Sequence, residues 1–394
     1  MTDTSVRRRA AFARRTAQLT GSRLIELLRL GHELGAVDLA VGTPEFPATP
    51  RPLADAAVSA ILAGRNQYAD PVGDPGTRRR IAASFATPAD PESEITVTVG
   101  ATEALCVALL ALVDPGDEVI VFEPYYECFV NAIALAGGVP RFVRLRRPDW
   151  RFDPAELRRA FGPRTRVLLA NTPGNPVGTV VTSAEWVEIA ELSARWDVTV
   201  VSDEVYAPYV FDGRAHVSAA DVPGLENRSV VVGSLSKSHA VSGWRLGFLR
   251  SDSRRSAVFR KVHEVTTNGT GAPLQAAVAI GSFDGDQRLP APGMQARRDQ
   301  ALRIFTSLGL DCRPPEGGCY LFASIDHQTD LAADDYAMWM LEEKRVLVVP
   351  GTAFTADRKY GEGFVRIAFN RSMETLLRAE QNLLLAGQES ACQS

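Results

Sequence analysis

The sequence predicts an α/β protein built on a mostly parallel sheet. From about residue 95, short runs rich in β-branched residues alternate with amphipathic segments, and this alternation is typical of α/β domains. The predicted strands are 95–99, 118–122, 166–170, 198–202 and 229–233. The predicted helices between them include 101–113, 153–161 and 183–196. Because ligands of such sheets bind beyond the carboxyl ends of the strands, we expect the functional residues directly after each run.

The last third of the chain predicts a second, smaller unit. A helical stretch over 275–308, interrupted near Pro290 and Pro292, leads into short strands around 319–325 and 364–369. The segment 42–50 is rich in Gly, Pro and Thr, as linkers are. We therefore expect an N-terminal arm that packs with the small unit, a large domain, and a small α+β domain, over 1–45, 46–275 and 276–394 respectively.

Composition and charge argue against several kinds of partner. The 394 residues suit two domains, and 45% hydrophobic with 23% charged residues is ordinary for a globular protein. A net charge of −4 gives no reason to expect nucleic acid or an anionic membrane, and no apolar run reaches the length of a membrane span. The five cysteines show no metal-ligand spacing, which favours reduced thiols and a cytoplasmic location. They are Cys106, Cys128, Cys312, Cys319 and Cys392.

The first fifteen residues are rich in arginine, which fits either a transit peptide or a docking arm. The arginines are Arg7, Arg8, Arg9, Arg14 and Arg15. Asp3 and the scarcity of serine favour the arm.

The segment 95–105 ends a predicted strand at Gly100 and begins a helix at once. Free N–H groups and the positive end of the helix dipole favour a phosphate at such a turn, beside Ala101 and Thr102. An ordinary strand–helix turn has the same pattern. After the strand 166–170, turn residues crowd around Asn175, whose amide offers both a donor and an acceptor at the strand end. A plain loop can have that composition too.

Two further segments place ionisable groups after apolar strands. Asp203 follows the run 198–202 and Tyr206 comes three residues later. A poorly solvated aspartate needs a cation or hydrogen bonds, although Asp is also a common helix N-cap. Lys237 is one of only four lysines, and small hydroxyl residues surround it. A buried amine can attack a carbonyl, whereas the alternative is a solvated loop lysine. Ser234, Ser236 and Arg245 suit a phosphate.

Together, and in this order, these motifs resemble the class I and II aminotransferases, which are pyridoxal 5′-phosphate enzymes of fold type I. The resemblance covers about residues 22–385 and implies a large domain with a mostly parallel seven-stranded sheet, plus a smaller α+β domain. It implies Lys237 as the Schiff-base lysine, Asp203 on the pyridine nitrogen, and Tyr206 and Asn175 on the ring hydroxyl. The phosphate ligands that it implies are Gly100, Ala101, Thr102, Ser234, Ser236 and Arg245.

The resemblance also extends to the substrate and to a second subunit. Glu123-Pro-Tyr-Tyr126 is similar to a segment whose second aromatic, here Tyr126, stacks on the cofactor ring. The match implies that Gly42, Asn175 and Arg366 bind the substrate, with Gly42 and Arg366 at its carboxylate. It also implies that Tyr68 reaches the phosphate of the partner in a homodimer. Two positions depart from the pattern, Cys319 and His239, where aromatic residues are common.

The expected activity is a ping-pong exchange of an amino group between an L-amino acid and a 2-oxo acid, with Lys237, Asp203 and Tyr206 as the catalytic residues. An alternative is the same fold running β-elimination, racemisation or cyclisation. A third reading is a non-catalytic regulator with an aminotransferase-like domain, which needs a DNA-binding domain ahead of the resemblance, where only about twenty residues stand. The motifs do not identify the amino acid, and no second arginine clearly marks a dicarboxylate.

Overall fold

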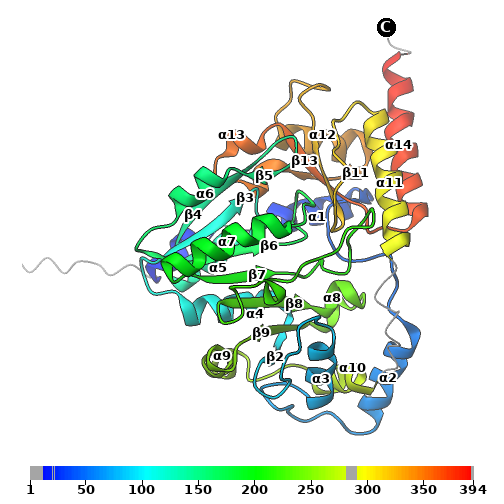
Figure 1. Cartoon of the computed structure of the whole chain (residues 1–394). Coiled ribbons are helices and arrows are strands. Elements are labelled where there is room, and N and C mark those ends of the chain that lie inside the picture. The colour runs from blue at the N-terminus through cyan, green and yellow to red at the C-terminus, as the bar shows by residue number, and fades with distance from the viewer. Residues whose placement is uncertain (1–11, 20, 22, 281–290, 392–394) are drawn as a thin grey trace, which may run out of the picture.

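A computed structural model describes residues 12–19, 21, 23–280 and 291–391 of the chain (Figure 1). Arg7, Arg8, Arg9 and Cys392 lie outside the described residues, so the N-terminal docking arm stays a prediction. The described N-terminal elements are a 3-10 turn, η1 (Arg14–Gln18), and the helix α1 (Arg23–Glu33).

Within the described residues, the main sheet has eight strands in the order β2-β9-β8-β7-β6-β3-β4-β5. Their bounds are β2 (Ile95–Val99), β3 (Glu118–Glu123), β4 (Val139–Arg146), β5 (Arg151–Phe152), β6 (Thr165–Asn171), β7 (Thr199–Asp203), β8 (Ser229–Ser234) and β9 (Leu246–Ser251). The five predicted strands are all present. The sheet has one strand more than the expected seven because the two-residue β5 pairs antiparallel with β4 at the edge.

The strand directions place one set of carboxyl ends at a common edge. β4, β3, β6, β7 and β8 run parallel to their neighbours in this series, whereas β9 is antiparallel to both β8 and β2. The predicted α/β class with a mostly parallel sheet is therefore confirmed. The loops after β6, β7 and β8 all leave the sheet at the same edge, where the alternation of the sequence predicts the site.

Helices cover both faces of this sheet, as its nearly all-apolar central strands require. Alternate strand residues point to opposite faces. Val119 and Val121 pack with α4 (Gly100–Leu112), α5 (Cys128–Ala136) and α9 (Ser253–Thr266). Ile120 points the other way, toward α6 (Pro154–Ala160) and α7 (Ser183–Trp196). The helices predicted at 101–113, 153–161 and 183–196 thus correspond to α4, α6 and α7.

A second, antiparallel sheet has the order β10-β13-β12 and lies under helices near the C-terminus (Figure 1). Its strands are β10 (Tyr320–Ser324), β12 (Val349–Pro350) and β13 (Phe364–Ala368). The helices of this region are α11 (Ala291–Ser307), α12 (Ala333–Lys344), α13 (Arg358–Gly361) and α14 (Met373–Ala391). The short strand β1 (Val37–Asp38) pairs in parallel with β11 (Val346–Leu347), so residues just before 42 do lie against the C-terminal part.

The helical stretch predicted over 275–308 has two ends with different neighbours. α10 (Ala272–Ile280) packs against α2 (Arg51–Leu62) and α3 (Pro75–Ala83) beside the main sheet. α11 instead runs alongside α14, as the yellow and red helices of Figure 1 show. Pro290 is outside the described residues. The division into domains at residues 45 and 275 stays a prediction.

Short elements complete the described chain. The turn-like helix α8 (Leu235–Ser238) follows β8 directly, and its N-cap is Ser234, whose side chain accepts a hydrogen bond from the N–H of Ser236. The remaining 3-10 turns are η2 (Ala219–Asp221), η3 (Ser242–Trp244) and η4 (Gly351–Phe354).

Candidate active site

A cavity of about 400 Å³ opens beyond the carboxyl ends of β6, β7 and β8. Most of the residues singled out in the sequence line it together. They are Gly42, Ala101, Thr102, Tyr126, Asn175, Asp203, Tyr206, Ser234, Ser236, Lys237, Arg245 and Arg366. Gly100 lies directly behind this lining, and Tyr68 lies away from it. Segments from all parts of the chain therefore converge on one pocket.

Lys237 occupies the third position of α8, where its side chain enters the cavity. Its Nζ donates a 2.5 Å hydrogen bond to the carbonyl oxygen of Gly42, and its own carbonyl accepts a 2.7 Å bond from the hydroxyl of Tyr209. Burial, reinforced by the positive charges of Arg366 and nearby arginines, lowers the pKa of this amine below its usual value. A lower pKa leaves more of the neutral form, which is the nucleophile and the base.

Asp203 ends β7, opposite Asn171 of β6. Its carboxylate accepts a 3.2 Å hydrogen bond from the N–H of Val205. Among the residues that the structure describes, no cationic side chain forms an ion pair with it. Burial, with a smaller contribution from the charge of Glu204, raises the pKa of Asp203 to about 7. A buried carboxylate without a counter-charge can hold a cationic group of a ligand.

A second part of the cavity is suited to an anion. It lies at the N-terminus of α4, where Val99 provides no side-chain cap and the first N–H groups are free for a ligand. Gly100 has φ +73°, and a Cβ there would overlap the guanidinium of Arg245. Arg245 donates a 3.1 Å hydrogen bond to the carbonyl of Ser242 and has no ion pair within the described residues. With Ser234 and Ser236 in the same lining, these groups form a cradle for a phosphate.

A third part of the cavity is built around Arg366, which lies on β13 and is 2% exposed. Its Nη1 donates to the Oδ1 of Asn175 at 3.0 Å, and its Nη2 donates to the carbonyl of Ala40 at 2.7 Å. The Nε is buried without a hydrogen-bond partner. Within the described part of the chain the guanidinium has no carboxylate partner, so it can accept the carboxylate of a ligand.

Tyr320 is a cavity residue that the sequence analysis did not select. Its hydroxyl accepts a 3.2 Å hydrogen bond from the hydroxyl of Tyr206, and its ring lies 4.2 Å from the Cζ of Arg366. A Cβ at Gly42 would overlap the Tyr320 hydroxyl, so only glycine fits there. The neighbouring Cys319 is fully buried in the apolar core that β10 and β13 share with α11, α12 and α14, which agrees with simple strand packing.

Further lining residues were also missed, and two of them show why. Cys128, which begins α5, lies in the wall near Tyr126, and Leu24 of α1 reaches the same cavity. Cys128 follows the motif at 123–126, so its proximity to that motif was the only signal in the sequence. Leu24 belongs to an amphipathic helix with no motif of its own. His239 does not line the cavity, and burial lowers the pKa of its ring to about 4.

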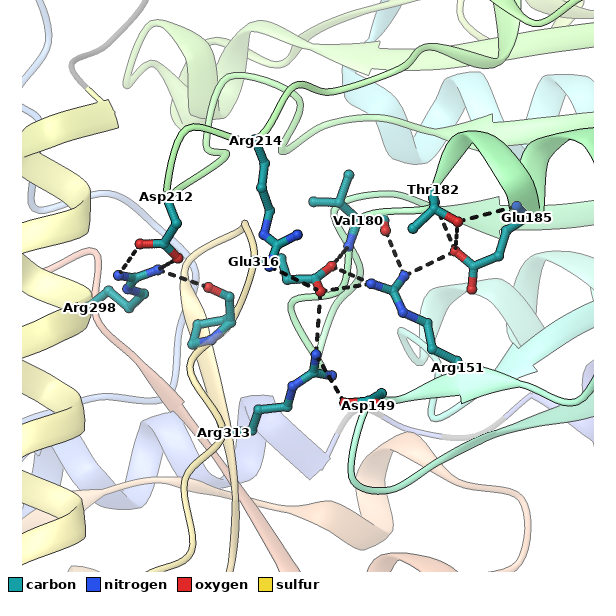
Figure 2. A network of polar contacts seen from close by, with 11 residues as sticks. Asp149, Arg151, Val180, Thr182, Glu185, Asp212, Arg214, Arg298, Arg313 and Glu316 are labelled. Carbon is teal, nitrogen blue, oxygen red and sulfur yellow. Dashed lines mark hydrogen bonds and ion pairs between the residues drawn. The ribbon is translucent and has the colours of Figure 1, made fainter.

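The loop that carries Asn175 is held from behind by an ion-pair network centred on Glu316 (Figure 2). Glu316 is 5% exposed and accepts hydrogen bonds of 2.7 Å from Arg151 and 2.9 Å from the N–H of Val180. The carbonyl of Gly178 accepts hydrogen bonds from the N–H groups of Glu316 and Gly317. The same segment continues into Tyr320, so this network supports both sides of the Arg366 subsite.

Figure 2 shows that further arginines surround the same carboxylate. Arg313 lies 3.4 Å from Glu316 and from Asp149, and Arg214 lies 3.9 Å from Glu316. Nearby, Arg298 of α11 pairs with Asp212 at 2.5 Å. These contacts join the segment 311–318 to the edge of the main sheet and to the loop after β7.

Tyr68 is 93% exposed and lies on the irregular segment between α2 and α3. Other large apolar side chains are exposed in the elements around it, including Leu62 at 82% and Val265 at 83%. An aromatic side chain with this much exposed surface is available for contact with another chain.

The described residues offer neither a metal site nor a helical membrane span. They contain no group of three or more His, Cys, Asp or Glu side chains placed to hold a metal ion. None of the helices described is both long enough and apolar enough to cross a bilayer.

Comparison with known proteins gives consistent matches over nearly the whole chain. Residues 35–383 match the family described as aminotransferase class I and II. The chain is 30% identical to kynurenine–oxoglutarate transaminase 3 of Mus musculus, over 94% of this chain and 89% of that protein. It is 32% identical to the methionine aminotransferase of Escherichia coli, over 93% and 96% of the two chains. Its structure is similar to that of N-succinyldiaminopimelate aminotransferase from Mycobacterium tuberculosis, with a TM-score of 0.92, 32% identity, and coverage of 95% and 100%.

Proposed function

This chain belongs to the class I and II aminotransferases, and from that premise we propose that it works with pyridoxal 5′-phosphate bound at Lys237. It is an enzyme that exchanges an amino group between an amino acid and a 2-oxo acid. The alternatives that the sequence left open, β-elimination, racemisation and cyclisation, are set aside because the relatives named above are transaminases.

One observation carries the proposal about the cofactor. A buried amine, Lys237, and a buried carboxylate, Asp203, line the same cavity as the anion cradle. Pyridoxal phosphate has an aldehyde, a basic ring nitrogen and a phosphate, so each of its groups meets a complementary one. Gly100, Ala101, Thr102, Ser234, Ser236 and Arg245 would hold the phosphate. Tyr126 would stack on the ring, and Tyr206 with Asn175 would face its hydroxyl.

When bound, the cofactor supplies an electron sink that makes the α-proton of an amino acid acidic. Asp203 would keep a proton on the ring nitrogen, because its own raised pKa shows how poorly a bare negative charge is tolerated there. Lys237 would take the proton from the substrate Cα as general base and return it as general acid. Its depressed pKa suits this role near neutral pH.

Arg366 and Asn175 would bind the substrate carboxylate and fix the direction of the Cα–H bond. The unpartnered Nε of Arg366 supports this assignment because a carboxylate oxygen would satisfy it. Gly42 leaves room for the Tyr320 hydroxyl beside this subsite and provides the carbonyl that Lys237 contacts.

We also propose a homodimer in which Tyr68 reaches the phosphate of the partner's cofactor. The 93% exposure of the Tyr68 side chain supports this, because it leaves the side chain free to contact a second subunit. A two-fold axis would place the same segment of each subunit at the other's site. The four described cysteines are free thiols, which fits the cytoplasmic location expected from the sequence.

The cavity favours a substrate with an uncharged side chain. The cations in the described lining are Lys237, Arg245 and Arg366. Lys237 is assigned to the cofactor aldehyde, Arg245 to the cofactor phosphate and Arg366 to the substrate carboxylate. No cation of the lining is therefore left for an acidic substrate side chain. The rest of the wall is largely apolar or aromatic, and it includes Leu24, Val41, Tyr126, Phe129 and Tyr320. Initial rates with methionine, leucine and phenylalanine, compared with aspartate and glutamate, test this inference.

The half-reaction tests the proposed function as a whole. Protein loaded with pyridoxal phosphate is mixed with a single amino acid and no 2-oxo acid. We expect one equivalent of 2-oxo acid per site, together with conversion of the cofactor absorbance to that of pyridoxamine phosphate. Release of ammonia with the cofactor absorbance unchanged would contradict the proposal.

A further inference from the structure

A buried histidine lies outside the cavity and contacts two of the segments to which the proposed function gives cofactor roles. His263, on α9, has no exposed surface. Its Nδ1 lies 2.8 Å from the Oε1 of Glu103, and its Nε2 lies 2.9 Å from the carbonyl oxygen of Pro71. A carbonyl oxygen only accepts, so the Nε2 carries a proton.

The other ring nitrogen lies against the carboxylate of Glu103. Burial alone would raise the pKa of Glu103, but hydrogen bonds from His263, Thr267 and the N–H of Val99 outweigh it and leave the pKa lowered. Glu103 is therefore an ionised acceptor, and the hydroxyl of Thr267 also lies 3.2 Å from the Nδ1 of His263. His263 thus contacts a carboxylate on one side and a backbone carbonyl on the other.

The contact with Glu103 connects His263 to the phosphate cradle. Glu103 lies in the first turn of α4 and folds back to accept the N–H of Val99 at 2.5 Å. Val99 immediately precedes Gly100, so this contact fixes the turn that presents Gly100, Ala101 and Thr102 to the cavity. His263 thereby orients the carboxylate that holds this turn.

The contact with Pro71 connects His263 to the segment that carries Tyr68. Pro71 follows Tyr68 by three residues. The loop after α9 packs closely on Pro71, since a Cβ added at Gly269 would lie 3.5 Å from the Pro71 Cα. Gln275, which has no exposed surface, holds the next turn by accepting the N–H of Asp74 at 2.7 Å. These contacts hold the chain just after Tyr68, and we call the segment between α2 and α3 the Tyr68 arm.

We propose that His263 is a positioning residue that couples the phosphate cradle of its own subunit to the Tyr68 arm, and so links the two cofactor sites of the dimer. The inference rests on the proposed function, because it takes the roles of the α4 turn and of Tyr68 from it. His263 itself touches neither cofactor nor substrate.

Two substitutions at His263 each remove one of its two contacts and keep the other. The amide nitrogen of asparagine can replace the Nδ1, so His263→Asn keeps the bond to Glu103 and loses the bond to Pro71. The amide of glutamine reaches farther and can replace the Nε2, so His263→Gln keeps the bond to Pro71 and loses the bond to Glu103. His32→Asn, at an exposed histidine, is the matched control.

The measurement is the dissociation constant of pyridoxal phosphate from each variant dimer, by cofactor fluorescence, alone and combined with Tyr68→Phe. We expect each His263 variant to weaken binding about tenfold, the effect of losing one buried hydrogen bond. His263→Asn should add little in the Tyr68→Phe background, because the arm contact is already lost there. His263→Gln should add its full effect, because it acts through α4.

Equal effects of His263→Asn in both backgrounds would overturn the inference. If His263→Asn does not give soluble protein, His263→Gln and Glu103→Gln take its place. The effects of these two substitutions on the dissociation constant should be non-additive with each other and additive with the effect of Tyr68→Phe. The opposite pattern would also overturn the inference. Neither outcome touches the proposed function, whose failure would instead appear as unsubstituted chain that binds no pyridoxal phosphate.

Discussion

Arg366 donates a 3.0 Å hydrogen bond to the side-chain oxygen of Asn175, and this contact joins the small antiparallel sheet to the loop that follows β6. The two residues are far apart in the sequence, and both line the cavity. Binding of a substrate carboxylate at this point would therefore bring together groups from both sheets.

Arg366→Lys is expected to raise the KM for the amino acid while leaving the affinity for pyridoxal phosphate unchanged. Lysine keeps the charge but loses the forked donors, and a hydrogen bond between charged groups contributes about 1.5–3 kcal/mol. Steady-state kinetics and a cofactor titration of the same preparation check this. An unchanged KM would show that the carboxylate binds elsewhere.

Asp203→Asn should have opposite effects on the cofactor-free and the loaded protein. In the cofactor-free protein burial raises the pKa of Asp203 from 3.8 to about 7. The folded form then holds a proton that the unfolded form releases, so the free energy of unfolding falls as the pH rises from about 4 to about 7 and then levels off. A shift of this size is worth several kcal/mol, on the order of 4. Asparagine cannot ionise and avoids that loss.

We therefore expect cofactor-free Asp203→Asn to be more stable than the unsubstituted chain at pH 8 and not at pH 4, by urea unfolding. The loaded variant should lose most of its turnover, since the ring nitrogen has no partner for its proton. Groups that act in this way contribute on the order of 3 kcal/mol to rate. Greater stability of the unsubstituted cofactor-free chain at pH 8 would contradict the electrostatic account of Asp203.

The sequence predicts the central strands well because their apolar, β-branched runs leave little choice of structure. β4 escaped prediction because Val139–Arg146 contains a proline and three arginines and lies partly exposed near the edge of the sheet. β9 was missed because it is antiparallel and follows η3 with no helix of ordinary length before it. Both are strands whose positions depend on their neighbours more than on their own composition.

Among the site residues, those in sequence motifs after strands were found, and those defined only by distant contacts were not. Lys237 and Asp203 stand out locally as charges beside apolar or small residues. Tyr320 and His263 have no local signal, since each is placed by packing between segments more than a hundred residues apart. The exposed position of Tyr68 could not be predicted from the sequence either. The motif identifies the residues next to Tyr68 along the chain, but not those that surround it in the fold.

Because Tyr68 is proposed to act at the partner's site, two different inactive subunits should complement each other. Tyr68→Ala and Lys237→Ala homodimers should each be impaired. After subunit exchange, a mixed dimer has one site with both lesions and one with neither, so part of the activity should return. Sedimentation establishes that mixed dimers are present. No recovery in a mixture that contains them, or a fully active monomer, would rule out a contribution in trans.

Glu316→Gln is expected to destabilise the protein and to raise the KM for the amino acid. Removing the charge of Glu316 takes one shared acceptor from three arginines, of which Arg151 keeps Glu185 and Arg313 keeps Asp149, so the expected cost is about 1.5–3 kcal/mol. Chemical unfolding and steady-state kinetics check the two effects. Glu380→Gln is the control, since its pair with Arg303 lies near the surface and should contribute less than about 1 kcal/mol. Equal effects at the two positions would contradict the role given to the Glu316 network.

The attachment of the cofactor tests the central claim most directly. Protein loaded with pyridoxal phosphate is reduced with borohydride, digested and mapped by mass spectrometry. The chain has only four lysines, Lys237, Lys261, Lys344 and Lys359, so the assignment is unambiguous. The phosphopyridoxyl group should appear on Lys237, and Lys237→Ala should take up no label and show no turnover. Label on one of the other three lysines, or turnover by Lys237→Ala, would contradict the account.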